Sequence, residues 1–576
     1  MRCCAGYWPP GAGGVHRPGA LRCDIGSGEC AFTARDEFTG ENIMSDAIAR
    51  ATRLISRRGF LGVTGAAVTL AFGTNLPGRD TAAGSASTIR ADPFTLGIAS
   101  GDPLPDAVVL WTRLAPQPLD PMGGMDRRTV PVRWQVARDE HFRQVVRSGV
   151  ATAHPEYRHS VHVDVRGLAP GRQYFYRFRA GSHLSPVGRT RTAPDPRASV
   201  SRLRFAFASC QNYPEGFYTA YRHMAAEDLD VVFFLGDYIY ENAVDALGGV
   251  RASSTAIPDL FTVAPDTLDL YRLRYSLYKS DPDLQAAHAA FPWIVTWDDH
   301  EVEDNYAGDV SKFNTPVDDF VVQRANAYRA FWEHQPLRVP LQPKGPDALF
   351  YRRFGFGDLL QVNVLDTRQY RSDQACGDGA KAGCAGAADP ARTMTGDVQE
   401  KWLLDGMAAS HARWNLIAQQ VMLVQRKVSL TDPALVSMDA WDGYQASRQR
   451  LLDGLVQRGT PGLFVITGDT HTNYAADIKR NFDDETSSTI GVELVGTSIS
   501  SGGDGEDTNA DRQLDLAANP HIKFANQQRG YVSCALDRDQ VRADFKVVPF
   551  ISTPGAPVTV RASFTSLHAQ PGLETV

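Results

Sequence analysis

Residues 231–241 have the sequence Val231-Val232-Phe233-Phe234-Leu235-Gly236-Asp237-Tyr238-Ile239-Tyr240-Glu241. Five apolar residues give way at once to a glycine, a carboxylate and two tyrosines. An unbroken apolar run of this length is typical of a parallel strand that is buried on both faces. In open α/β sheets, ligands bind at the carboxyl ends of such strands. The segment therefore predicts an α/β sheet with a polar site at one edge.

Three more strings repeat this change from an apolar run to polar residues. The runs at 205–208, 293–296 and 463–467 lead into Ser209-Cys210, Trp297-Asp298-Asp299-His300-Glu301 and Gly468-Asp469-Thr470-His471. Because parallel strands end at the same edge of a sheet, we expect the thiol, carboxylates, phenol and imidazoles to converge there. Such side chains are metal ligands, so the pattern indicates metal-assisted hydrolysis rather than binding alone.

Two parts of the chain differ in their periodicity. Within residues 197–576, apolar runs alternate with amphipathic segments, which predicts a layered α/β domain. Its expected helices cover residues 217–227, 266–278, 319–333, 398–412 and 444–457. Within residues 91–196, short period-two strands at 132–137, 160–165 and 173–178 are separated by Pro and Gly turns. That pattern predicts a small all-β sandwich, similar to fibronectin type III or immunoglobulin-like modules.

The first 90 residues are predicted to be an extension and a targeting signal. Ser56-Arg57-Arg58-Gly59-Phe60-Leu61 is a twin-arginine string, followed by an apolar stretch at 61–72 that is too short to span a bilayer. Small residues at 82–87 offer a cleavage zone. The segment resembles a bacterial twin-arginine export signal. We therefore expect the twin-arginine translocation machinery as a partner and a periplasmic or extracellular location.

The composition and the positions of the cysteines restrict the functions and the cellular location that we expect. The net charge of −7 gives no overall basic surface, which argues against a nucleic-acid scaffold role, and no transmembrane segment is expected in the mature chain. Cys376 and Cys384 flank a Gly/Ala-rich loop, and a disulfide between them suits an oxidising compartment. Cys534 lies in an apolar strand-like segment and is expected to be buried. Cys210 is either a packing residue or a ligand.

Individual side chains suggest roles. Asp237 is suited to bridging two cations, and the glycine before it allows a tight turn. Asp469 and His471 alternate by two, so an extended segment would direct both toward one metal. Tyr240 is either a phenolate ligand or aromatic packing. His300 could hold a phosphate or protonate a leaving group.

Two further strings extend the predicted pocket. Arg368 follows the apolar run at 359–365, and it is either a bidentate phosphate clamp or a structural ion pair. Asp439 and Asp442 precede the helix expected at 444–457, so they either bind a calcium-like ion or, as we favour, cap that helix.

Taken together, the strings resemble the PhoD family of alkaline phosphatases and phosphodiesterases. The resemblance is carried by Phe94-Thr95-Leu96-Gly97-Ile98-Ala99-Ser100-Gly101-Asp102-Pro103, Val109-Leu110-Trp111-Thr112-Arg113-Leu114, Phe207-Ala208-Ser209-Cys210-Gln211 and the three strings around Asp237, Asp299 and Asp469. It implies a metallophosphoesterase-like core that contains ferric iron (Fe3+) and calcium (Ca2+). By matching position, the residues expected around the iron are Cys210, Asp237, Tyr240, Asp469 and His471. Asp237 would bridge to calcium, and Asp299 would be a further metal ligand.

The expected activity is hydrolysis of small phosphate esters by a metal-activated water. Bound cations would orient the phosphate and lower the pKa of water toward about 7. No Gly-x-Ser-x-Gly nucleophile motif lies near these strands, so a covalent intermediate is not required. Two alternatives remain open: a phospholipase D-type phosphodiesterase on the same core, and an extracellular binding protein without catalysis.

Overall fold

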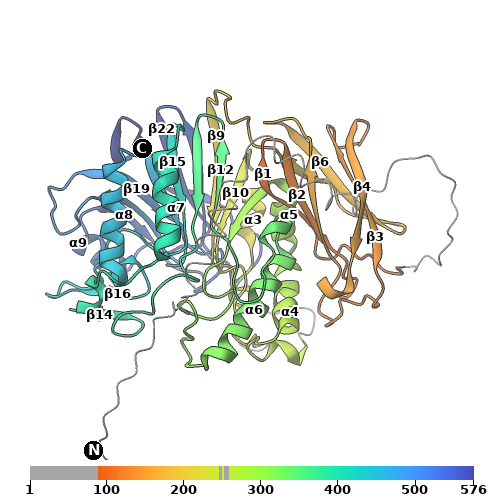
Figure 1. Ribbon diagram of the computed structural model, residues 1–576, viewed down its shortest axis with the longest axis horizontal. Helices are drawn as coiled ribbons and strands as arrows, with labels where there is room; N and C mark the ends of the chain where they lie inside the picture. The colour runs from red at the N-terminus through yellow and green to blue at the C-terminus, as the bar shows by residue number, and fades with distance from the viewer. Residues whose placement is uncertain (1–88, 245–249, 252–257) are drawn as a thin grey trace, which may run out of the picture. The chain divides into compact units, whose positions relative to one another are not determined.

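The computed structural model describes residues 89–244, 250–251 and 258–576, and these described residues form one compact unit (Figure 1). The predicted extension and twin-arginine signal fall on residues 1–88, outside the described part. Among the described residues, no helix is both long enough and apolar enough to cross a membrane.

A ten-stranded sheet forms the first layer. Three parallel strands lie at its centre: β9 (Arg202–Ala208), β10 (Val231–Leu235) and β11 (Pro292–Thr296). On the β9 side, the antiparallel strands are β21 (Gly530–Asp537), β22 (Gln540–Val547), β23 (Thr559–Leu567) and β24 (Gln570–Thr575). On the β11 side, the strands are β1 (Ile98–Leu104), β2 (Ala107–Arg113) and β5 (Ser160–Arg166).

A seven-stranded sheet forms the second layer. Its parallel strands are β13 (Leu360–Val364), β15 (Trp414–Ala418), β17 (Leu463–Thr467) and β19 (Thr489–Val495). Antiparallel strands complete it: β12 (Arg352–Phe356), β18 (Asn473–Lys479) and β20 (Ile522–Asn526). A small ribbon pairs β14 (Ala380–Ala382) with β16 (Leu435–Ser437).

The two sheets pack face to face, and helices cover their outer faces (Figure 1). Phe205 of β9 stacks on Phe464 of β17 across the interface, with ring centroids 6.4 Å apart. The helices over the first sheet are α3 (Thr219–Ala225), α4 (Leu268–Lys279), α5 (Pro282–Ala290) and α6 (Val317–His334). The helices over the second sheet are α7 (Gly396–Ala408) and α8 (Gln445–Gln457), and α9 (Ala510–Ala518) packs on β20. The five predicted helices are confirmed, whereas α5 and α9 were not predicted.

The N-terminal strands do not form an isolated module. A five-stranded sheet contains β3 (Val130–Ala137), β4 (Val145–Ala153), β6 (Gln173–Ala180), β7 (His183–Leu184) and β8 (Gly188–Arg191). It packs against β1, β2 and β5, but those strands belong to the ten-stranded sheet because β1 pairs in parallel with β11. Sheet hydrogen bonds therefore cross the boundary predicted at residue 196. Period-two patterns show where strands lie but not which distant strand each one pairs with.

Candidate metal centre

Seven side chains from the predicted strings meet where β9, β10, β11 and β17 end. The donor atoms of Cys210, Asp237 and His471 lie within 4.8 Å of one another. Two further groups meet the same limit, and their members are Asp237, Asp299 and His300, then Asp298, Asp299 and Asp469. Asp237 and Asp299 each belong to two groups. The geometry therefore places three overlapping donor sets along one edge.

Four of these residues have an unusual backbone. The φ angles of Cys210, Asp237, Asp469 and His471 lie between 53° and 63°, in the left-handed region that costs free energy for residues with a side chain. Asp469 and His471 thus lie in a bend after β17, and the expectation of an extended segment was wrong. They reach the site because the left-handed turns redirect the chain.

Two glycines allow the strand ends to approach closely. A Cβ atom at Gly236, where φ is 107°, would lie 2.3 Å from the Cβ of Asp298. A Cβ atom at Gly468 would lie 2.6 Å from the Oγ of Ser209. The predicted tight turn at Gly236 is confirmed, and its cause in the structure is packing between neighbouring strand ends.

Tyr240 lies inside the donor cluster rather than in a separate aromatic core. Its hydroxyl donates to Asp237 Oδ2 at 3.0 Å and lies 3.1 Å from His471 Nε2, while Ser501 Oγ donates to it at 2.7 Å. Burial and the Asp237 carboxylate raise the pKa of Tyr240 well above its usual value. The same two causes raise the pKa of the Cys210 thiol. At neutral pH, a phenolate at Tyr240 or a thiolate at Cys210 would therefore need a nearby cation to stabilise it.

His300 lies at the rim of the cluster, with 15% of its side chain exposed. Its Nδ1 is 2.7 Å from Glu241 Oε2, and its ring stacks on Tyr240 with a centroid distance of 4.1 Å. Burial disfavours the imidazolium, but the carboxylates of Glu241, Asp299 and Asp237 outweigh burial and hold the pKa of His300 well above its usual value.

Arg368 is fully buried among carboxylates. It donates to Asp298, to both oxygens of Asp439 at 3.0 and 2.9 Å, and to Asp469 at 3.4 Å. Of the two interpretations of Arg368, this geometry favours the structural ion pair over the phosphate clamp. Its guanidinium fixes the carboxylates relative to one another.

Neither predicted helix cap is observed. Asp439 accepts from Arg368 and from Arg371 at 2.6 Å, and Asp442 pairs with Arg448 at 2.6 Å. Helix α8 starts after Tyr444 without a side-chain cap. The capping expectation was wrong because buried arginines compete for both carboxylates.

Glu301 is a site residue to which the sequence alone gave no role. Its carboxylate accepts the backbone N–H groups of Asp237 at 3.1 Å, Tyr238 at 2.5 Å and Asp298 at 2.8 Å. It thereby ties the turn after β10 to the turn after β11. The only signal was its place in an unusually polar string, because its partners at 237 and 238 are distant in sequence.

The cluster has the properties of a cation site. Asp237 Oδ1, Asp298 Oδ2 and Asp299 Oδ1 are buried without a hydrogen-bond partner among the described residues. Burial, followed by the net effect of neighbouring charges, raises the pKa of Asp237 and Asp469 well above the usual value. Clustered carboxylates of this kind are stabilised by bound cations. The residues present therefore fit metal ions.

The donor sets differ in chemistry. The group around Cys210 offers a thiol, an imidazole and a carboxylate beside the Tyr240 phenol, a mixture suited to a transition metal. The group of Asp298, Asp299 and Asp469 offers only carboxylate oxygens, which hard cations such as calcium prefer. Two unlike cations would match this division.

Comparison with known proteins gives consistent results over nearly the whole described chain. A family model described as "PhoD-like phosphatase" matches residues 205–545, and one described as its N-terminal domain matches residues 80–194. The chain is 49% identical to "Alkaline phosphatase D" of Bacillus subtilis (strain 168) over 496 residues, which are 85% of this chain and 84% of that protein. A solved structure described as "Structure of PhoD" matches with a TM-score of 0.81 and 49% identity, covering 84% of this chain and 92% of that one.

Proposed function

This chain belongs to the PhoD-like phosphatase family and is a phosphoric ester hydrolase, and we propose that it works through two cations held at the edge of its parallel strands. The main support for this proposal is that the three donor sets overlap, because Asp237 and Asp299 each belong to two of them. Iron would be held by Cys210, Asp237, Tyr240, Asp469 and His471. Calcium would share Asp237 and would also contact Asp299, whereas Asp469, which lies in the same all-carboxylate group as Asp299, would bind the iron. When bound, such ions orient phosphate and lower the pKa of water.

The chain's own residues have separate tasks in this proposal. His300, protonated at neutral pH, would donate a proton from Nε2 to the leaving-group oxygen. Glu241 would hold Nδ1 and so aim the ring, because their contact is 2.7 Å. Arg368 would act indirectly by fixing the carboxylates of Asp298 and Asp439.

The proton-donor role predicts a dependence on the leaving group. We expect His300→Asn to slow hydrolysis of an alkyl phosphate by about 100-fold or more, because alkoxide leaving groups need a proton. Hydrolysis of 4-nitrophenyl phosphate should fall much less, since nitrophenolate leaves without one. Steady-state rates on both esters test this, and an equal loss on the two would contradict the role.

Elemental analysis of the purified protein tests the proposal as a whole. We expect iron and calcium, loss of activity on chelation, and visible absorption from thiolate or phenolate bound to iron. Parallel assays on 4-nitrophenyl phosphate and bis(4-nitrophenyl) phosphate separate the monoesterase from the phosphodiesterase alternative. Full activity after the removal of all metal would overturn the proposal.

Three finer expectations accompany this function. We propose export of the folded protein by the twin-arginine route, with a periplasmic or extracellular location, on the basis of the string at residues 56–61. The helix–sheet–sheet–helix layering supports a metallophosphoesterase-like catalytic domain within residues 197–576. Residues 91–196 would be its β module.

A further inference from the structure

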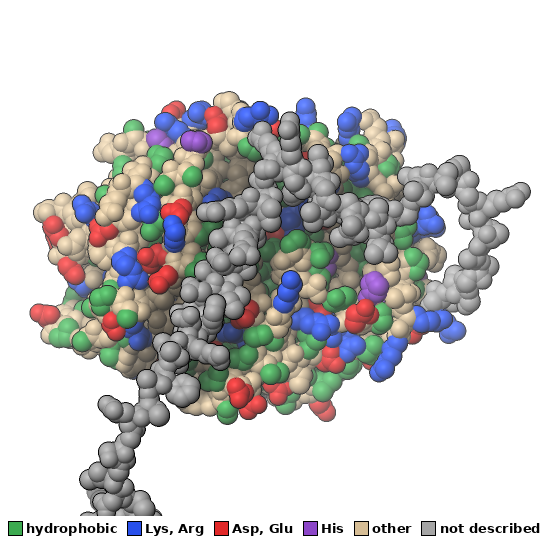
Figure 2. Space-filling model, in the orientation of Figure 1, with side chains coloured by type: hydrophobic (Ala, Val, Ile, Leu, Met, Phe, Trp, Pro, Cys, Tyr) green, Lys and Arg blue, Asp and Glu red, His purple; other side chains and the backbone are tan. Residues whose placement is uncertain are grey.

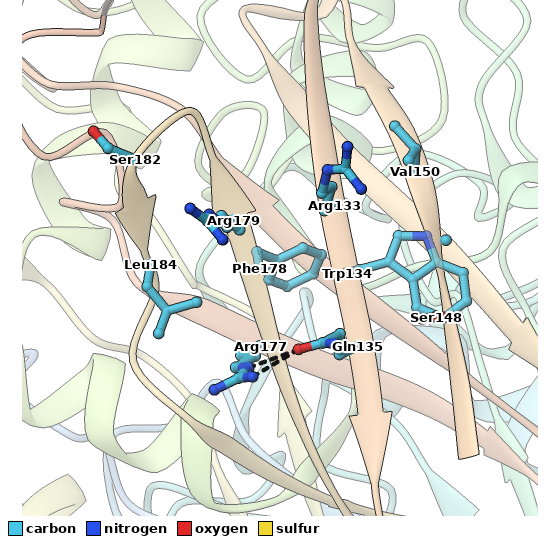
Figure 3. Close-up of a pocket in the computed structure, with 11 residues that line it drawn as sticks. Arg133, Trp134, Gln135, Ser148, Val150, Arg177, Phe178, Arg179, Ser182 and Leu184 are labelled. Atoms are coloured by element: carbon cyan, nitrogen blue, oxygen red, sulfur yellow. Dashed lines mark hydrogen bonds between the residues drawn. The ribbon is translucent and has the colours of Figure 1, made fainter. Parts of the chain in front are cut away.

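The outer face of the five-stranded sheet has a groove that lies outside the metal centre. Figure 3 shows Arg133 and Arg179 between Leu184 on one side and Val150 on the other. The cavity measures about 590 Å³, and no acidic side chain lines it. Val150 and Leu184 are 58% and 51% exposed. The groove therefore combines arginines with exposed apolar walls.

The arginines of this groove have no carboxylate partner among the described residues. Arg133 and Arg179 lie directly opposite each other on β3 and β6, and Gln135 faces Arg177 two pairs further along. Like charges in directly opposite positions destabilise an antiparallel pair. By contrast, Arg166 on the neighbouring strand β5 is paired with Asp164. An external anion would relieve this repulsion.

One arginine is already held in place. Arg177 donates Nε and Nη2 to Gln135 Oε1 at 2.9 and 2.8 Å (Figure 3). Its guanidinium also lies 4.0 Å from the centre of the Phe142 ring. Both contacts leave its positive charge uncompensated. A guanidinium fixed by neutral neighbours loses little conformational entropy when it binds an anion.

The charge of this region contrasts with the rest of the chain. Residues 91–196 contain fourteen arginines, no lysine and ten acidic residues, whereas residues 197–576 have a net charge of −14. Figure 2 shows Lys and Arg side chains gathered on the side formed by the N-terminal strands, at the right of the view. An anionic partner would therefore be directed to this face rather than to the rest of the surface.

We propose that this groove binds a linear polymer of phosphodiester-linked units. Residues two apart on a strand, such as Arg177 and Arg179, are about 6.8 Å apart, an interval similar to that between successive phosphates of an extended phosphodiester chain. Arginine binds phosphate oxygens bidentately, and the apolar walls can contact the linking groups. A hollowed surface suits a chain better than a bilayer, which presents a broad flat face. This site needs no metal and does not depend on the proposed catalytic mechanism.

Fluorescence polarisation with labelled decathymidylate as the phosphodiester chain tests the proposal on the full exported protein with chelator present. We expect Arg133→Ala/Arg179→Ala to weaken binding at least about tenfold and to reduce the slope of log K against log salt by about 1.4. Both positions are exposed, so the melting temperature and the hydrolysis of 4-nitrophenyl phosphate by metal-loaded protein should not change.

A matched variant and three competing ligands test whether binding is specific to the groove and to a phosphodiester chain. Arg127→Ala/Arg172→Ala removes two exposed arginines of the same region outside the groove and should bind like wild type. Inorganic phosphate should compete only weakly. The proposal is overturned by absence of binding to wild type, by an equal loss in the matched variant, or by equal binding of polyglutamate. Tighter binding to phosphatidylglycerol vesicles would also overturn it, in favour of a membrane partner.

Discussion

At the scale of single residues, Asp237 carries most of the proposed mechanism because it belongs to two donor groups. We expect Asp237→Asn to reduce kcat/KM for an aryl phosphate by at least about a thousandfold, as a lost metal ligand costs several kcal/mol of transition-state stabilisation. Burial disfavours the Asp237 carboxylate, so the metal-free variant should have a melting temperature equal to or above that of the metal-free wild type. Near-normal hydrolysis by the variant would contradict the bridging role.

Replacing Glu301 tests whether the residues that hold the proposed ligands in position affect metal binding. We expect Glu301→Gln to weaken metal binding by about 10- to 100-fold, because an amide has one acceptor oxygen for three backbone N–H groups. Competition with a calibrated chelator measures this without an activity assay. Glu303→Gln is the matched control, since Glu303 accepts from Ser311 instead. Equal losses in the two variants would exclude a specific role for Glu301.

The sequence indicated the proposed ligands better than the residues that support them. Cys210, Asp237 and His471 follow apolar runs, and strand ends in a parallel sheet are brought together by its topology. Glu301 and Ser501 could not be assigned in this way. Apart from Asp298, which lies three positions before Glu301, their partners are 63 or more positions away, and the contacts depend on left-handed turns that no period reveals.

At the scale of elements, the loop closed by Cys376 and Cys384 supports the proposed metal centre. The structure confirms the disulfide. Asp378 inside the loop accepts two hydrogen bonds from Asn305 at 3.1 Å, and the Asn305 N–H donates to Asp299 at 2.7 Å. The loop therefore connects covalent closure to a proposed ligand.

We expect Cys376→Ser/Cys384→Ser to lower the free energy of unfolding by about 2–3 kcal/mol, because the open loop regains conformational freedom in the unfolded chain. Urea unfolding measures this loss. Wild type treated with reductant should match the variant, and the variant itself should not respond to reductant. If reductant lowered the stability of the variant as well, the effect of reductant would not come from this disulfide.

The elements themselves were predictable to different degrees. The buried parallel strands stood out as apolar runs, and the longer helices as amphipathic segments. Helix α5 has nine residues, and its Ala-rich sequence gives little periodic signal. Helix α9 is equally short but amphipathic, so its residues carry a helical pattern that the prediction did not use. The pairing of β1 with β11 was not predictable, because it joins strands almost two hundred residues apart.

At the scale of the whole molecule, buried neutral histidines make stability depend on pH. Burial lowers the pKa of His521 to about 4, below the value of about 6.5 in an unfolded chain. Between these values the unfolded state binds a proton that the folded state does not. The free energy of unfolding should therefore fall as pH falls from 6.5 to 4, by up to about 3 kcal/mol for this residue.

The measurement is thermal or urea unfolding of metal-free protein at several pH values. His521→Gln retains a donor for the Gln425 carbonyl, which now lies 2.7 Å from His521 Nε2, but cannot be protonated. Its stability should vary less steeply between pH 6.5 and 4. Parallel curves for variant and wild type would rule out a contribution from His521.

The order of the ten-stranded sheet has a consequence for biosynthesis. Strand β9, which carries Cys210 at its end, is flanked by β21, with Val532 opposite Phe207. A ribosome must therefore release most of the polypeptide before β9 gains its outer neighbour. A product of premature termination would keep an open strand edge and be prone to aggregation. Only a finished translation product can complete the sheet.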